Sequence, residues 1–101
     1  MQKGVTAAQK GNFETALREW TPLAEQGYAK AQYNLGVMYG LGNGVIQDNV
    51  YAHMWFNIAA SSGDKGSSKN RDIVAKQMTP AQIAEAQKLA RECVRKKYKG
   101  C

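Results

Sequence analysis

Apolar residues recur at intervals of three and four positions along most of the chain, as they do on one face of an α-helix. Four such stripes can be followed: Ala16, Leu17, Trp20, Leu23, Ala24 and Gly27; Ala31, Leu35, Met38 and Tyr39; Ala52, Trp55, Phe56, Ala59 and Ala60; and Ile83, Ala86, Ala90, Cys93 and Val94. No segment shows the alternation of apolar and polar residues that a half-buried strand requires. The pattern therefore predicts an all-α fold.

Helix-ending and capping residues separate these stripes. Glycines or polar turns are expected to end helices near Lys10, at Gly27, between Gly40 and Gly44, and at Ser62-Gly63. Asp48 and Thr79 are candidate N-caps, and Thr79-Pro80-Ala81-Gln82 has the form of a capping box with proline at the first helical position. We expect about six helices in all. Pro22 should kink or reset the second of them.

The sequence also repeats itself when it is shifted by 36 residues. The shift aligns Ala16 with Ala52, Trp20 with Phe56, Ala24 with Ala60, Gly27 with Gly63 and Asn34 with Asn70. Small residues recur where two helices approach closely, and a large aromatic recurs where it can fill the space between them. The register fades after Asn70, as expected of a terminal unit that caps a stack.

One segment carries a family motif. "AQYNLGVMYGLGNGVIQDNVYAHMWFNIAASSG" resembles a Sel1-like repeat through Ala31, Leu35, Gly36, Tyr39, Gly42, Gly44, Val45, Asp48, Ala52, Trp55, Phe56, Ala59, Ala60 and Gly63. The preceding "GNFETALREWTPLAEQG" resembles the second half of another repeat, with a shorter, tetratricopeptide-like turn at Gly11-Asn12. The resemblance extends over roughly Ala7 to Asn70.

The resemblance implies an α-solenoid of antiparallel helix pairs within a single domain. Residues 1–28 would form a partial first repeat, residues 29–63 a full repeat, and residues 64–101 a degenerate helix followed by a basic capping helix. Proteins of this family are mostly adaptors in protein assemblies, and many bacterial members are exported. We therefore expect a non-enzymatic module that binds a protein or peptide partner.

In related solenoids the first helix of each pair lines the concave face. Within the predicted helix over 29–39, the side chains that lie off the core stripe are those of Lys30, Tyr33, Asn34 and Val37. The 36-residue shift places Lys69, Asn70 and Ile73 in the row equivalent to Tyr33, Asn34 and Val37. Asparagine can hydrogen-bond a peptide backbone, and tyrosine offers contact area at low entropic cost. This row is the candidate groove, and a plain solvated helix face is the alternative. Two pairs and a cap make the groove shallow, so homo-oligomerisation could be needed.

No catalytic, metal-binding or cofactor-binding constellation stands out. "GLGNG" lacks the last glycine of a dinucleotide fingerprint, because Val45 occupies its place, and no G-K-[ST] follows. His53 is the single histidine, and we expect a partly exposed helix side chain there. Some cysteine-rich relatives have been linked with β-lactam binding or hydrolysis. No S-x-x-K motif supports that function here, so it ranks last.

Positive charge is concentrated at one end. The net charge is +6, and residues 88–101 carry six basic residues against Glu92 alone. Arg91, Arg95, Lys96, Lys97 and Lys99 could form a patch for an acidic protein, anionic lipid or nucleic acid. They could equally be a solubilising cap that favours the helix dipole. The near-neutral remainder argues against a nucleic-acid-binding protein.

Cys93 and Cys101 are the only cysteines. On one unbroken helix they would lie about 12 Å apart, too far for a disulfide, but Gly100 could turn the chain back. Cysteine-rich bacterial members of the family pair cysteines eight residues apart, and this spacing implies the same pair here. The resemblance favours a periplasmic or secreted protein, with the cytoplasm as the alternative. No signal peptide or membrane-spanning stretch is visible.

Overall fold

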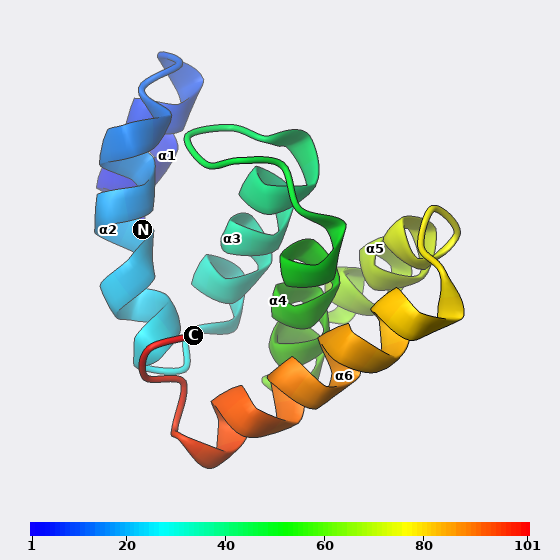
Figure 1. Ribbon diagram of the computed structural model, residues 1–101. Helices are drawn as coiled ribbons and strands as arrows, with labels where there is room; N and C mark the ends of the chain where they lie inside the picture. Colours follow the sequence, from blue (N-terminus) through cyan, green and yellow to red (C-terminus); the bar gives the residue numbers. More distant parts are fainter.

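The computed structural model describes residues 1–101 and is entirely helical, as predicted (Figure 1). Its six helices are α1 (Gln2–Gln9), α2 (Phe13–Glu25), α3 (Ala29–Leu41), α4 (Asn49–Ser61), α5 (Lys65–Ala75) and α6 (Pro80–Arg95). The molecule measures 36 × 26 × 23 Å along its principal axes. No helix has both the length and the apolar character required to cross a membrane.

The predicted helix caps are confirmed. The Asp48 carboxylate accepts a hydrogen bond from the backbone N–H of Tyr51 at 3.1 Å, at the start of α4. Thr79 and Gln82 form both hydrogen bonds of a capping box at the start of α6, at 3.1 and 2.9 Å. Gly42 adopts a φ of 73° and ends α3, a conformation that glycine takes without the steric penalty of a Cβ.

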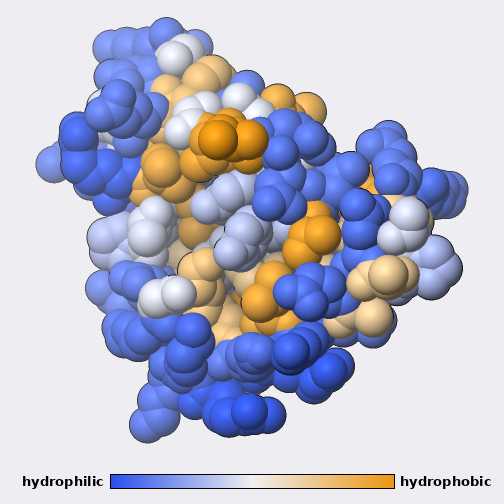
Figure 2. Space-filling model, viewed as in Figure 1, coloured by the Kyte–Doolittle hydropathy of each residue, from blue (hydrophilic) through white to orange (hydrophobic).

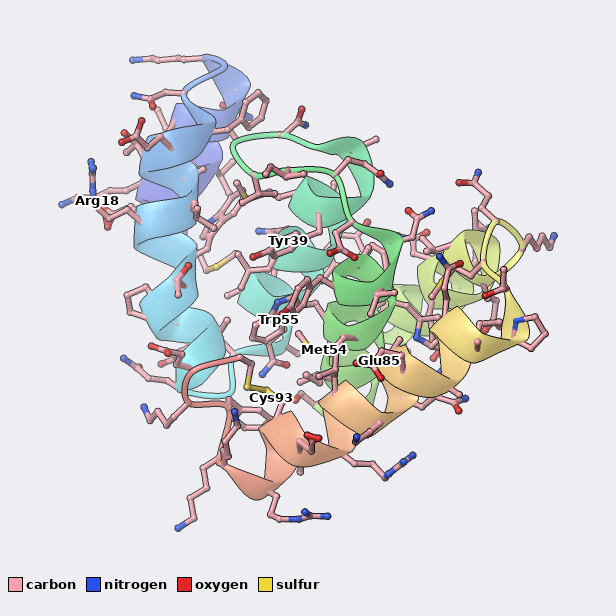
Figure 3. The ribbon with its side chains drawn as sticks, in the orientation of Figure 1. Arg18, Tyr39, Met54, Trp55, Glu85 and Cys93 are labelled. Atoms are coloured by element: carbon pink, nitrogen blue, oxygen red, sulfur yellow. A yellow bond between two sulfur atoms is a disulfide. The ribbon has the colours of Figure 1, made fainter.

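Pro22 does not reset its helix. Helix α2 continues through Pro22 to Glu25, because the proline lies in the last turn, where few helical hydrogen bonds remain to be lost. Pro22 is exposed, and so is Arg18, whose carbonyl loses its usual N–H partner. The Arg18 side chain extends into solvent on the outer side of α2 (Figure 3).

The helices pack in succession, α1 on α2, α2 on α3 and α3 on α4. The last two helices depart from this order, because α5 and α6 both pack on α4 rather than mainly on each other (Figure 1). Helix α4 is therefore enclosed by α3, α5 and α6, and seven of its thirteen residues are buried. The predicted stack of helix pairs is present, with a third pair that is opened out around α4.

The two predicted repeat aromatics occupy matching environments. A Cβ added to Gly4 would lie 2.2 Å from Nε1 of Trp20, and one added to Gly36 would lie 2.7 Å from the Phe56 ring. Each ring thus lies directly on a glycine of the preceding helix, and both rings are buried. The glycines are 32 residues apart and the aromatics 36, because the loop within the second pair is four residues longer.

A shared core joins the units. Trp55 of α4 and Tyr39 of α3 lie in the space between α2 and α4, whereas Met54 of α4 lies on the side that faces Cys93 of α6 (Figure 3). Apolar side chains gather in the hollow between α2 and α4, whereas the surface over α6 and the C-terminal segment is mostly hydrophilic (Figure 2). The core of this repeat protein is thus continuous from the first pair to the capping helix.

Candidate binding groove

A groove of about 350 Å³ lies between α3 and α5. Most of its lining is apolar, and its lining residues are Tyr33, Val37, Gly40, Leu41, Phe56, Asn70, Ile73, Val74 and Gln77. Leu41 is 67% exposed and Ile73 is 48% exposed, which is unusual for such large apolar side chains. The groove therefore presents apolar surface that a partner could cover.

A polar contact across the groove sets its geometry. Asn70 of α5 donates a hydrogen bond from Nδ2 to the Tyr33 hydroxyl of α3 at 3.0 Å. The Tyr33 ring also packs against Phe56, with 5.7 Å between ring centroids and a tilt of 51°. Tyr33 is thus held from two sides, so it offers a preorganised surface rather than a mobile one.

Lys30 stands at the edge of the groove. Its ammonium lies 4.9 Å from the centroid of the Tyr33 ring and 3.4 Å from the Asp64 carboxylate. Because the Lys30 side chain is well exposed, both interactions are screened by water and contribute little to stability.

The predicted row of seven residues is only partly assembled in the groove. The residues that line it are Tyr33, Val37, Asn70 and Ile73, and Lys30 flanks it. Asn34 and Lys69 do not contribute to the lining. The groove is also lined by five residues that the predicted row did not contain: Gly40, Leu41, Phe56, Val74 and Gln77. In the sequence, the groove is indicated by the large apolar residues Leu41 and Ile73 off the core stripes, and the predicted row contains only Ile73 of these two.

His53 is buried, so the expectation of a partly exposed side chain is wrong. It retains 3% exposure because α4 is enclosed by three helices, and its Nδ1 has no hydrogen-bond partner. Burial lowers the pKa of His53 below its ordinary value, and the nearby positive charge of Arg71 lowers it further, while Asp72 acts in the opposite direction. The imidazole is therefore neutral at pH 7.

Protonation of His53 is expected to destabilise the fold. Since the folded-state pKa is below the ordinary 6.5, the unfolded chain binds the proton more tightly. The free energy of unfolding should fall as the pH drops below 6.5, and this loss should level off below the folded-state pKa. As His53 is the single histidine, NMR titration of its ring protons measures that pKa directly. A midpoint at or above 6.5 would contradict the expectation, and H53Q should lack this pH-dependent component.

The C-terminal segment folds back onto the helices. Lys97, Tyr98 and Gly100 have positive φ values of 55°, 68° and 69°, which reverse the chain after α6. The structure then joins Cys101 to Cys93 in a disulfide with 5.6 Å between the Cα atoms (Figure 3). The Tyr98 ring rests against Gly27, beyond the end of α2. The pair closes a turn after one helix and does not link two helices, unlike the pairing in the cysteine-rich relatives.

The five residues of the predicted basic patch are all exposed, and none takes part in a salt bridge. Arg91 and Arg95 lie on α6, whereas Lys96, Lys97 and Lys99 belong to the turn that follows. The structure assembles no group of three or more histidine, cysteine, aspartate or glutamate side chains that could hold a metal ion.

Helix pairs stacked around one core, with a groove along the first helices, define an α-solenoid repeat protein. Residues 29–64, which comprise α3, the following loop and α4, match the family model of the Sel1 repeat. This segment of the chain therefore carries a Sel1 repeat, as its motif predicted. Sel1 repeats are generally protein-interaction modules and typically non-enzymatic. A search of curated proteins found no significant match to this chain.

Proposed function

We propose that this protein is a non-enzymatic binding module that holds a peptide segment of a protein partner in the groove between α3 and α5. The observation that carries the proposal is the apolar lining of this groove, in which Leu41 and Ile73 remain exposed. The Tyr33 hydroxyl, Asn70 and Gln77 supply hydrogen-bonding groups beside the apolar surface. Apolar contact area with a few fixed polar groups is what peptide grooves generally provide.

The proposal predicts which substitutions abolish binding. Peptides selected from a random library on the native protein should bind L41E and I73E at least about tenfold more weakly, because each change places a charge in apolar contact area. I46E is the matched control, since Ile46 is 90% exposed and does not line the groove. Fluorescence anisotropy measures the affinities. Equal binding to all three variants and to the native protein would reject the groove as the binding site.

The disulfide predicts an oxidising compartment. Disulfides persist in the periplasm and outside the cell, whereas cytosolic thiols are kept reduced. We expect native protein that is alkylated without reductant to gain no mass. The variant C93S/C101S should be about 2–3 kcal/mol less stable, because without the cross-link the unfolded chain gains conformational entropy. Two alkylated thiols in protein taken from its host would contradict this, and would point to the cytoplasm.

A further inference from the structure

We infer that the outer face between α4 and α6 is a second docking surface, built to receive an acidic segment of a protein partner. A pocket of about 240 Å³ opens there, lined by Asn57, Ile58, Ser61, Ala90, Arg91 and Val94. None of these residues lines the groove between α3 and α5. The two surfaces can therefore be tested independently.

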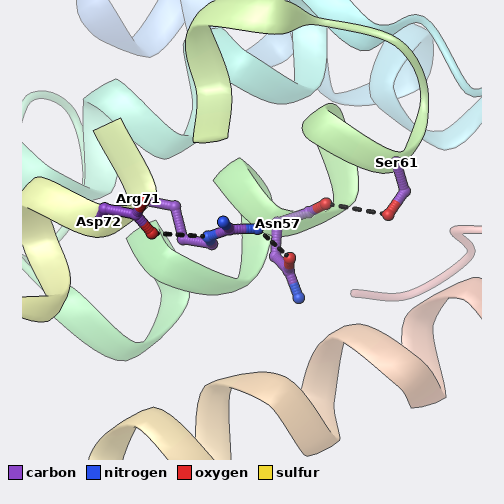
Figure 4. A network of polar contacts seen from close by, with 4 residues as sticks. All are labelled: Asn57, Ser61, Arg71 and Asp72. Atoms are coloured by element: carbon purple, nitrogen blue, oxygen red, sulfur yellow. Dashed lines mark hydrogen bonds and ion pairs between the residues drawn. The ribbon is translucent and has the colours of Figure 1, made fainter. Parts of the chain in front are cut away.

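The polar group of the pocket is held in a fixed orientation. Nη1 of Arg71 donates a hydrogen bond to Oδ1 of Asn57 at 2.9 Å, and Arg71 is itself paired with Asp72 at 3.2 Å (Figure 4). Because a guanidinium can only donate, this bond assigns the oxygen of the Asn57 amide to the Arg71 side. Nδ2 of Asn57 is then directed toward α6 and has no hydrogen-bond partner within the protein (Figure 4). The pocket thus offers an N–H donor to an acceptor group.

Positive charge lies at the pocket, which Arg91 lines, and next to it along α6. Lys88, Arg91 and Arg95 follow helical spacing and so share one face of α6, and all three are exposed. No carboxylate forms a salt bridge with any of them. A carboxylate in the pocket would accept from Asn57 and face Arg91, a charge-assisted arrangement that is stronger than a neutral hydrogen bond.

Apolar surface accompanies this charge. Val94 is 47% exposed between Arg91 and Arg95, and Ile58 and Ala90 contribute to the pocket wall. A flat polybasic surface would suffice for a membrane or for nucleic-acid phosphates. A pocket with one directed donor and an apolar wall fits instead a peptide in which a carboxylate side chain neighbours an apolar one.

The test uses the full chain and a defined probe. The peptide acetyl-Glu-Glu-Leu-Glu-Glu-amide is titrated into ¹⁵N-labelled protein, and the same peptide with glutamine at every glutamate position is the control. We expect saturable shifts at the Asn57 side-chain amide and at the backbone of Arg91 and Val94, and weaker binding as salt is raised. The glutamine peptide should bind at least about tenfold more weakly.

Three variants sharpen the test. N57D keeps an oxygen for Arg71 but turns the second carboxylate oxygen toward the pocket, so it should weaken binding at least about tenfold without unfolding the protein. R91E should also weaken binding at least about tenfold, because it places a negative charge where the peptide carboxylate binds. K10E removes an equal charge from the exposed end of α1 and should change the affinity by less than about twofold.

Several results would overturn this inference. The absence of saturable shifts would do so. So would binding of the glutamine peptide as tight as that of the glutamate peptide, or an affinity for N57D equal to that for the native protein. Shifts confined to Tyr33 and Ile73 would assign the peptide to the groove instead. Tighter binding of DNA or phosphatidylglycerol vesicles with no shift at Asn57 would show a nonspecific polyanion surface. Because L41E and I73E should still bind the acidic peptide, failure here is distinguishable from failure of the proposed groove.

Discussion

Replacing Phe56 by alanine is expected to lower the free energy of unfolding by about 3–5 kcal/mol. The Phe56 side chain is 3% exposed, and its ring fills the space left by Gly36 and packs on Tyr33. Truncation would leave a cavity that rigid neighbouring helices cannot close. W20A should have an effect of the same size, since Trp20 lies on Gly4 in the same way. Urea unfolding followed by circular dichroism measures both.

An exposed aromatic provides the control. Tyr28 is 54% exposed, so Y28A should change stability by no more than about 0.5 kcal/mol. A native domain is stable by only about 5–15 kcal/mol, so loss of either buried ring removes a large share of the total. If F56A or W20A were no more destabilising than Y28A, the matching roles of the two rings would have to be abandoned.

Replacing Gly36 by alanine is expected to destabilise the protein by about 1–3 kcal/mol. On helix propensity alone the change should stabilise α3 by up to about 1 kcal/mol. However, the new methyl group would lie 2.7 Å from the Phe56 ring, which is 3% exposed and would have to shift from its contacts with α3. Steric overlap therefore outweighs propensity. The same urea measurement gives the sign of the change directly.

Gly66 is the matched control for Gly36. It lies in α5, it is exposed, and the nearest atom to an added Cβ is a carboxylate oxygen at 3.9 Å. G66A should therefore be neutral or stabilising by up to about 1 kcal/mol. Combining G36A with F56L should recover part of the loss, because the smaller side chain makes room for the methyl group. Stabilisation by G36A would contradict the close packing of α3 on the Phe56 ring.

The features predicted well from the sequence are those that depend on neighbouring residues. Asp48, Thr79 and Gln82 act as caps through hydrogen bonds to residues three positions away. The stripe that contains Trp20 and the stripe that contains Phe56 are fixed by helical spacing within one element. Their equivalence could be predicted because the sequence repeats, and a repeat implies the same packing in each unit.

The features that were missed depend on how distant helices meet. His53 is buried because α5 and α6 both close over α4, and no spacing within α4 indicates that arrangement. Asn70 turns toward Tyr33, 37 residues away, instead of continuing a row with Asn34. Phe56 serves both the core and the wall of the groove, so its assignment to the core left the groove incomplete.

The account depends most on the aromatic ring of each unit resting on the glycine of the helix before it. Nuclear Overhauser effects test this without any substitution. We predict contacts between the Trp20 indole protons and the Hα protons of Gly4, and between the Phe56 ring protons and those of Gly36. Observation of one set without the other, or of neither, would contradict the assembly of this protein from two equivalent, stacked units.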